Sequence, residues 1–105
     1  MSTFSDFQTN VVAALSVTGG TGALAGGGGA TPARAGAGDY TVTLNEGVDE
    51  TECLITLTCK TAAVTLTAGH TSDTIKTVAG LDTATGLVAT DGDFDIKIER
   101  ILTGH

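Results

Sequence analysis

Large aromatic side chains are scarce in this chain of 105 residues, which has three phenylalanines, one tyrosine and no tryptophan. Fully burying one large apolar side chain contributes roughly 1.5–3 kcal/mol, so a core rich in Thr and Ala is thin. A single domain of this length already buries a modest share of its surface. We therefore expect the chain to bury more surface against copies of itself, in a closed and symmetric homo-oligomer.

Basic residues are also few, because five Lys and Arg stand against 12 Asp and Glu and leave a net charge of −7. They are scattered along the chain, whereas nucleic-acid binders concentrate their basic residues on one surface. The sequence therefore predicts neither nucleic acid nor an acidic membrane as a partner. Solubility is a sufficient reason for the acidity.

Long apolar runs are missing, and none approaches the roughly 20 residues of a membrane-spanning helix. Residues 1–10 contain no Lys or Arg and no long apolar stretch, so a secretory signal peptide is not predicted. We expect the protein to fold in a cytoplasm.

The two cysteines, Cys53 and Cys59, lie six residues apart in one expected strand. Six strand residues span about 20 Å, whereas the Cα atoms of a disulfide lie within about 7 Å of each other. Unless a turn falls between them, both cysteines are predicted to be free thiols. No histidine lies near them in sequence to complete a zinc site.

What the chain does have, from Asp39 to Leu102, is apolar residues that alternate with Thr or charged residues. Such alternation predicts half-buried strands, and turn residues recur about every ten positions. The pattern predicts an all-β fold, a compact antiparallel β-sandwich or small barrel. The expected core consists of Tyr40, Val42, Leu44, Ile55, Leu57, Leu66, Phe94, Ile96 and Ile98.

Residues 18–38 differ, because they are almost entirely Gly, Ala and Thr, with four consecutive glycines at 26–29. Glycine loses much backbone freedom on folding, and such a segment cannot build a core of its own. We expect residues 1–38 to form an extended Gly-rich N-terminal arm and residues 39–105 to form the β-sandwich domain. Within the arm, residues 11–17 favour a strand over a short helix.

The glycines at 20 and 22 loosely match a dinucleotide-binding loop, but that loop needs a helix after it and four glycines follow instead. Asp91, Asp93 and Asp95 match the start of a calcium loop. However, Ile96 stands where glycine is required, and no Glu closes the loop. No cofactor is predicted, and solvated carboxylates are favoured over a weak metal site.

Catalytic signatures are equally poor. His70, Ser72 and Asp73 have the residue types of a triad, but in one strand Asp73 would point away from the other two. The acidic cluster Glu46, Asp49, Glu50 and Glu52 falls in one loop and favours a solvated edge or a docking surface for a basic partner. We predict that the chain is not an enzyme, with a small hydrolase that uses His70 as the alternative.

Three phrases are distinctive: GAGDYTVTL at 36–44, TSDT at 71–74 and DFDIKIERI at 93–101. Together they resemble small β-sandwich proteins in the virions of tailed bacteriophages, over about residues 36–102. The resemblance implies a capsid decoration (cement) protein that is made in the host cytoplasm and is often a homotrimer. Such a protein binds the outer surface of the head and stabilises contacts between major capsid proteins. The alternative is a trimeric head-fibre or tail-fibre tip that binds the host surface, although the chain offers few aromatics for binding glycans.

A decoration protein needs a docking segment, and extended arms can add a strand to a neighbour's sheet. Buried aromatic side chains tend to dominate the energy of an interface. The arm offers Phe4, Phe7, Val11 and Val12, which we predict to be partner-binding residues.

Overall fold

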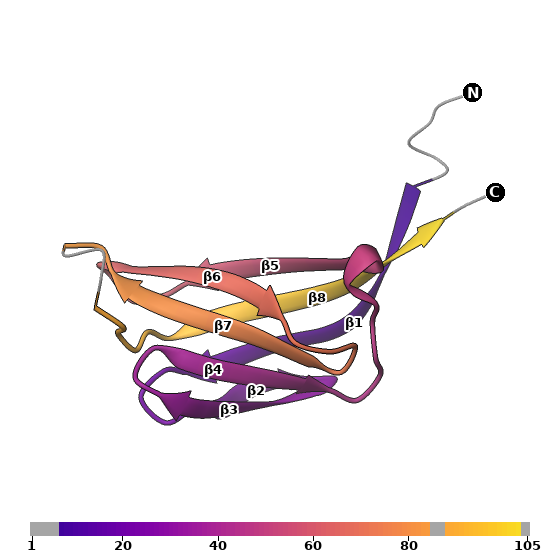
Figure 1. The fold of residues 1–105 in the computed structure, drawn as a ribbon. Coiled ribbons are helices and arrows are strands. Elements are labelled where there is room, and N and C mark those ends of the chain that lie inside the picture. The colour runs from indigo at the N-terminus through magenta and orange to yellow at the C-terminus, as the bar shows by residue number, and fades with distance from the viewer. Residues whose placement is uncertain (1–6, 85–87, 104–105) are drawn as a thin grey trace.

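Alternating apolar and polar residues give eight strands within residues 7–84 and 88–103, the part of the chain that the computed structural model describes (Figure 1). The strands are β1 (Phe7–Thr18), β2 (Ala23–Gly28), β3 (Ala30–Gly36), β4 (Asp39–Leu44), β5 (Cys53–Cys59), β6 (Val64–His70), β7 (Ile75–Asp82) and β8 (Phe94–Thr103). A short 3-10 turn, η2 (Glu50–Glu52), precedes β5.

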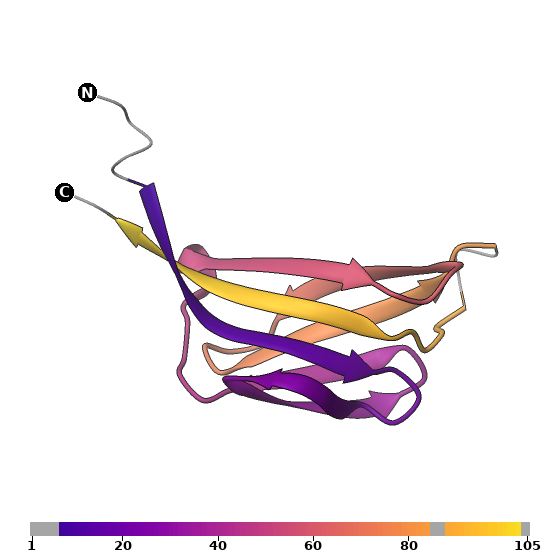
Figure 2. The ribbon, with the colours of Figure 1, turned by 180° about the vertical axis from the view of Figure 1, so that it is seen from behind.

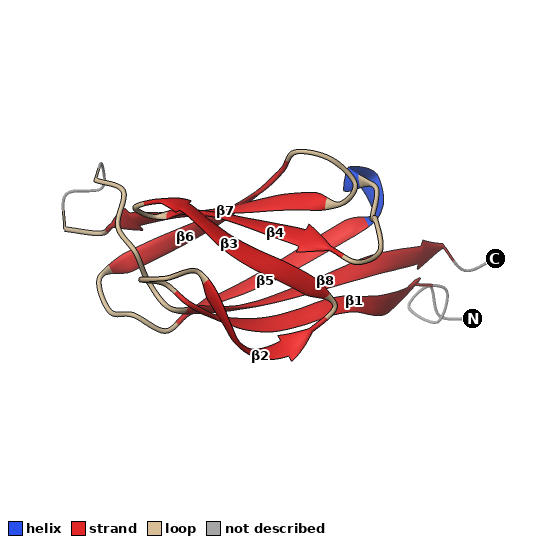
Figure 3. Ribbon diagram, turned by 90° about the horizontal axis from the view of Figure 1, so that it is seen from below, coloured by secondary structure: helices blue, strands red, loops and turns tan. Residues whose placement is uncertain are grey.

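The strands form two antiparallel sheets of four, in the orders β2-β1-β8-β5 and β3-β4-β7-β6. The sheets lie face to face, with β2 beside β3 along one side and β5 beside β6 along the other (Figures 1 and 3). The predicted all-β fold is confirmed. It is a sandwich, because the hydrogen-bonded ladders form two separate sheets.

The core lies between the sheets and uses the inward residues of β4 and β8. Tyr40, Val42 and Leu44 of β4 are buried, as are Phe94, Ile96 and Ile98 of β8. These six predicted core residues are confirmed. The other three, Ile55, Leu57 and Leu66, are only half-buried, because β5 and β6 are the edge strands on one side of the sandwich.

The N-terminal third differs most from its prediction. Residues 7–36 form β1, β2 and β3 and belong to the two sheets, so they are not an arm or connector outside the sandwich. β1 lies between β2 and β8 and buries Ala13, Leu15 and Val17. The Gly-rich segment needs no core of its own, because it lies at the sheet edges against strands that already have one.

The glycines also have a steric role beside β1. Gly27 and Gly29 have positive φ angles of 89° and 93°, which side chains rarely adopt. A Cβ at Gly27 would collide with the Ala14 carbonyl oxygen, and one at Gly29 with the Val12 carbonyl oxygen. These glycines let the backbone approach β1 closely, so at these two positions the sequence specifies a backbone conformation rather than flexibility.

β1 and β8 extend beyond the other strands as a two-stranded ribbon. Residues 7–9 pair with residues 101–103, whereas the pairing of β8 with β5 ends at Arg100. The ribbon rises from one end of the sandwich (Figures 1 and 2). Phe4 lies outside the described residues.

Candidate functional site

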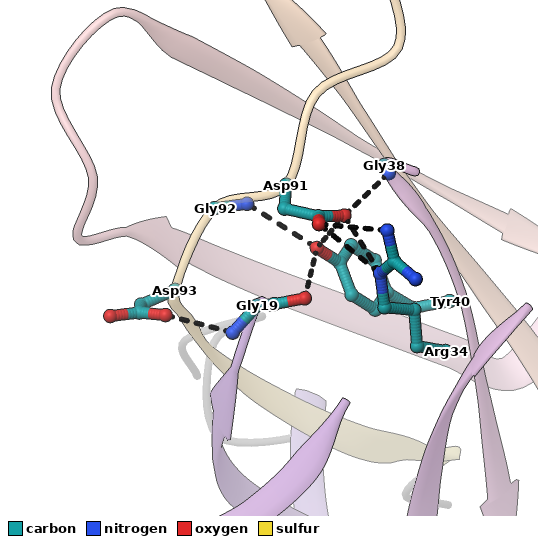
Figure 4. A network of polar contacts seen from close by, with 7 residues as sticks. All are labelled: Gly19, Arg34, Gly38, Tyr40, Asp91, Gly92 and Asp93. Carbon is teal, nitrogen blue, oxygen red and sulfur yellow. Dashed lines mark hydrogen bonds and ion pairs between the residues drawn. The ribbon is translucent and has the colours of Figure 1, made fainter. Parts of the chain in front are cut away.

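A buried tyrosine joins the loops at one end of the sandwich (Figure 4). The Tyr40 ring is fully buried and packs edge-to-face on Phe94, with ring centroids 5.1 Å apart. Its hydroxyl lies 2.9 Å from the Gly19 carbonyl oxygen and 3.0 Å from a carboxylate oxygen of Asp91, and it accepts a hydrogen bond from the Gly92 N–H at 3.3 Å. Burial raises the pKa of this hydroxyl.

Asp91 is the second centre of the same network. Its carboxylate accepts hydrogen bonds from Arg34 Nε at 3.1 Å and Nη2 at 2.9 Å, and from the Gly38 N–H at 2.8 Å. The bonds from Arg34, followed by the Gly38 N–H, lower the pKa of Asp91 to about 2. The network connects β3 and the β3–β4 turn to the loop before β8. Its polar groups are hydrogen-bonded to one another, so we interpret it as a network that stabilises the fold.

The three aspartates of the calcium-like phrase do not converge. Asp91 binds Arg34, Asp93 accepts from the Gly19 N–H at 2.8 Å, and Asp95 accepts from Ser16 Oγ at 2.6 Å and Lys60 Nζ at 3.2 Å. Within residues 7–84 and 88–103, no group of three or more His, Cys, Asp or Glu is placed to hold a metal ion. The carboxylates are engaged by protein donors, which the spacing alone could not reveal.

A buried lysine occupies the other end of the sandwich. Lys76 of β7 is fully buried, and its ammonium donates to the carbonyl oxygens of Val48 at 2.7 Å and Ser72 at 2.9 Å. His70 Nδ1 lies 2.7 Å from the same nitrogen. Two carbonyl oxygens and an imidazole nitrogen therefore surround the buried side-chain nitrogen of Lys76, so its polar contacts come from the protein itself.

The triad-like residues therefore serve other purposes. His70 contacts Lys76, the hydroxyl of Ser72 accepts from the Ile75 N–H at 3.2 Å, and the Asp73 carbonyl accepts from the Val48 N–H at 2.8 Å. None of these contacts joins a serine hydroxyl to an imidazole. Sequence reasoning missed Lys76, although the alternation of β7 placed it on the same face as the buried Val78.

The acidic loop is partly held by the protein itself. Glu46 pairs with Arg100, whose Nη2 also donates to the Gly47 carbonyl oxygen at 2.6 Å. The Asp49 carboxylate accepts from the N–H and the hydroxyl of Thr51, and these bonds lower its pKa. Glu50 and Glu52 remain exposed at the start of β5.

The sandwich is less well covered along β5 and β6 than in its centre. Cys53, Ile55 and Leu57 of β5 face the core, but each is only half-buried. A hollow of about 250 Å³ lies between the two strands, lined by Glu50, Cys53, Ile55, Ala68, Gly69 and His70. Cys53 and Cys59 are free thiols, as predicted.

The predicted partner-binding residues fall on or near the ribbon. The backbone of Phe7 pairs with Thr103, and Val11 pairs with Glu99 with its side chain 53% exposed. Val12 lies at an irregularity in the ladder and packs partly against the core. Leu102 of β8, which pairs with Gln8, is 39% exposed and was not singled out from the sequence.

No protein family model, curated protein or solved structure that was compared with this chain matches it. Among the described residues, no helix is both long enough and apolar enough to cross a membrane. The polar clusters hold the fold together, whereas the ribbon and the β5 edge expose apolar side chains. This arrangement suits binding to other chains.

Proposed function

We propose that this chain is a decoration protein of a tailed phage, which binds the outer surface of the head and stabilises contacts between major capsid proteins. The phrases in residues 36–102 support the virion role through their resemblance to such proteins. The β-sandwich is the fold that this resemblance implies. The proposed location is the exterior of the virion.

The ribbon of β1 and β8 is the observation that carries the proposal. Two-stranded ribbons are marginally stable in water by themselves, and no third strand of the described residues lies beside residues 7–9 and 101–103. Val11 and Leu102 expose apolar surface on or beside the ribbon. A neighbouring sheet edge or groove would supply the missing hydrogen bonds and bury these side chains.

Deletion of residues 1–10 tests this docking role. The deletion removes the β1 half of the ribbon but leaves Ala13, Leu15 and Val17 for the core. We expect the shortened protein to fold and to lose binding to heads of the encoding phage that lack their own copy, measured by co-sedimentation.

A matched pair of substitutions distinguishes docking through the ribbon from non-specific binding through exposed apolar side chains. Val11→Ser on β1 and Leu24→Ser on β2 each remove one side chain that is about half exposed, at 53% and 45%. Val11→Ser should weaken head binding several-fold, while Leu24→Ser should leave it unchanged. Equal binding by both variants and by the deleted protein would refute docking by the ribbon. Binding to host cells but not to heads would instead favour the fibre-tip alternative.

A further inference from the structure

The edge strand β5 lacks the features that usually keep a strand from pairing with another molecule. Edges in natural proteins are commonly protected by charge, proline or a bulge. Residues 53–59 read CLITLTC, without a charged residue, proline or glycine. The edge strand β3 on the other side carries Pro32 and Arg34, and β2 pairs with β1 through an irregular register.

Side chains along this edge are also incompletely covered. Ile55 and Leu57 of β5 and Leu66 of β6 pack against the core but stay half-exposed, while Ile98 and Ile96, the β8 neighbours of Ile55 and Leu57, are buried. Leu54 on the outer face is 38% exposed. A strand added beside β5 would cover this apolar surface and use its free backbone groups.

We propose that β5 pairs antiparallel with β5 of a second copy of this chain, about a two-fold axis through Thr56. The strand is self-complementary in this register. Ile55 lies opposite Leu57 of the copy, so the apolar inward faces meet, and Thr56 lies opposite Thr56. Cys53 lies opposite Cys59 of the copy at each end of the paired strands.

The charges that flank β5 match the same register. Glu52 ends the 3-10 turn η2 directly before the strand, and Lys60 follows the strand, where its Nζ also lies 3.2 Å from a carboxylate oxygen of Asp95. Both side chains are exposed. The two-fold axis through Thr56 brings Glu52 to the end of β5 in the copy where Lys60 lies, and the symmetry makes this contact twice. Copies with a net charge of −7 repel each other, so an uncharged strand bracketed by opposite charges favours approach along this edge.

Other registers fit less well. A slip of one residue would put inward side chains opposite outward ones, which the pleat forbids in a continuous sheet. A slip of two residues keeps the faces but shortens the pairing, and it separates Cys53 from Cys59 of the copy. The central register is the one that pairs all seven residues of β5.

This pairing joins the two sheets that contain β5 into one sheet across the dimer. It is two-fold, so it predicts a dimer where the resemblance to virion proteins implies a trimer. It does not depend on binding to a phage head, and it leaves the ribbon free.

A charge exchange tests the pairing in the full-length protein, with the dimer dissociation constant measured by analytical ultracentrifugation. Glu52→Lys or Lys60→Glu each convert two attractive pairs into repulsive ones. Each should raise the dissociation constant roughly tenfold, because two exposed ion pairs change sign. The double variant Glu52→Lys/Lys60→Glu should restore the original value. Both side chains are exposed, but Lys60→Glu also breaks the exposed ion pair with Asp95, so circular dichroism checks that each variant is folded.

Asp39→Lys is the matched control. It changes the net charge as Glu52→Lys does, but Asp39 is exposed at the start of β4 in the other sheet and should leave the constant near its original value. A monomer at every concentration, a trimer, or equal effects at 39 and 52 without rescue would overturn the proposal.

Mild oxidation with diamide, which accepts the two hydrogens of a thiol pair, independently tests which residues of the two β5 strands lie opposite each other. The two thiols of one chain are too far apart along β5 to join each other. Opposed residues of an antiparallel pair have Cα atoms about 4.5–5.5 Å apart, within disulfide range. Mass spectrometry of the linked dimer should find Cys53 joined to Cys59. Predominant links between two Cys53 or two Cys59 residues would contradict this register.

Discussion

The Tyr40 network and the β5 edge lie in one small sandwich, but they differ in how far their chemical groups are satisfied within the chain. Around Tyr40, the Asp91 carboxylate, the Arg34 guanidinium and nearby backbone groups bind one another. Along β5, apolar side chains stay half-exposed, and none of the described strands pairs with one edge of its backbone. The comparison teaches that hydrogen bonds among the polar groups of the Tyr40 network can stabilise a sandwich with a thin core. The β5 edge can then remain available for another chain.

Tyr40→Ala, in the Tyr40 network, should cause the largest loss in the free energy of unfolding. The ring is fully buried against Phe94, and its removal also takes away the hydroxyl at the centre of the network. Loss of a buried aromatic ring lowers the free energy of unfolding by about 3–5 kcal/mol. Urea denaturation monitored by circular dichroism measures the loss.

Tyr40→Phe is the control that separates ring from hydroxyl. It keeps the packing but leaves the Gly19 carbonyl and the Gly92 N–H without their bonds to the hydroxyl, at a cost of about 1–2 kcal/mol. If the Phe variant were as stable as the parent, the hydrogen bonds of the Tyr40 hydroxyl would not contribute to stability.

Ile98 and Ile55 sharpen the comparison, because they are opposite each other in the β8–β5 ladder. Ile98 is fully buried, so Ile98→Ala should cost about 2–5 kcal/mol. Ile55 is half-exposed in the single chain, and Ile55→Ala should cost roughly half as much or less in dilute solution.

Protein concentration provides the decisive readout for Ile55. Binding of a second copy stabilises the folded state, so the difference in melting temperature between Ile55→Ala and the parent should widen as concentration rises. The corresponding difference for Ile98→Ala should change much less. A concentration-independent loss at Ile55 would place that side chain outside any interface.

The smallest expected effect is the pH dependence of the stability that Asp91 contributes in the Tyr40 network. The pKa of Asp91 is lowered from 3.8 to about 2 by Arg34 and the Gly38 N–H. A carboxyl with a depressed pKa stabilises the folded protein above its ordinary pKa, and this contribution is lost as pH falls through about 2. The parent should therefore lose more stability than Asp91→Asn between pH about 4 and pH about 2, measured by urea midpoints. Parallel pH profiles for the two proteins would contradict this account of Asp91.

The strands that the sequence predicted are those whose alternation also sets burial. β4 and β8 carry large apolar residues on one face and Thr or charges on the other, so their core residues could be read directly. β2 and β3 could not, because glycine and alanine give no such contrast. Their place depends on edge contacts with β1 and β4, which are tertiary.

The polar sites were less predictable than the strands. Asp91 matched the start of a calcium loop but was expected to be solvated, because its partner Arg34 is distant in sequence. Lys76 lay in phase with buried residues, yet only the fold shows which carbonyls satisfy it. The symmetry of β5, from Glu52 to Lys60, is visible in the sequence, but its meaning depends on β5 being an edge.

The mass of the purified protein in solution, followed by light scattering over a dilution series, tests the comparison most directly. If the β5 edge is a surface for a second copy, the mass should approach twice the chain mass of 10.4 kDa at high concentration and fall toward 10.4 kDa on dilution. A constant mass of one chain, or a stable mass of three chains, would contradict the account.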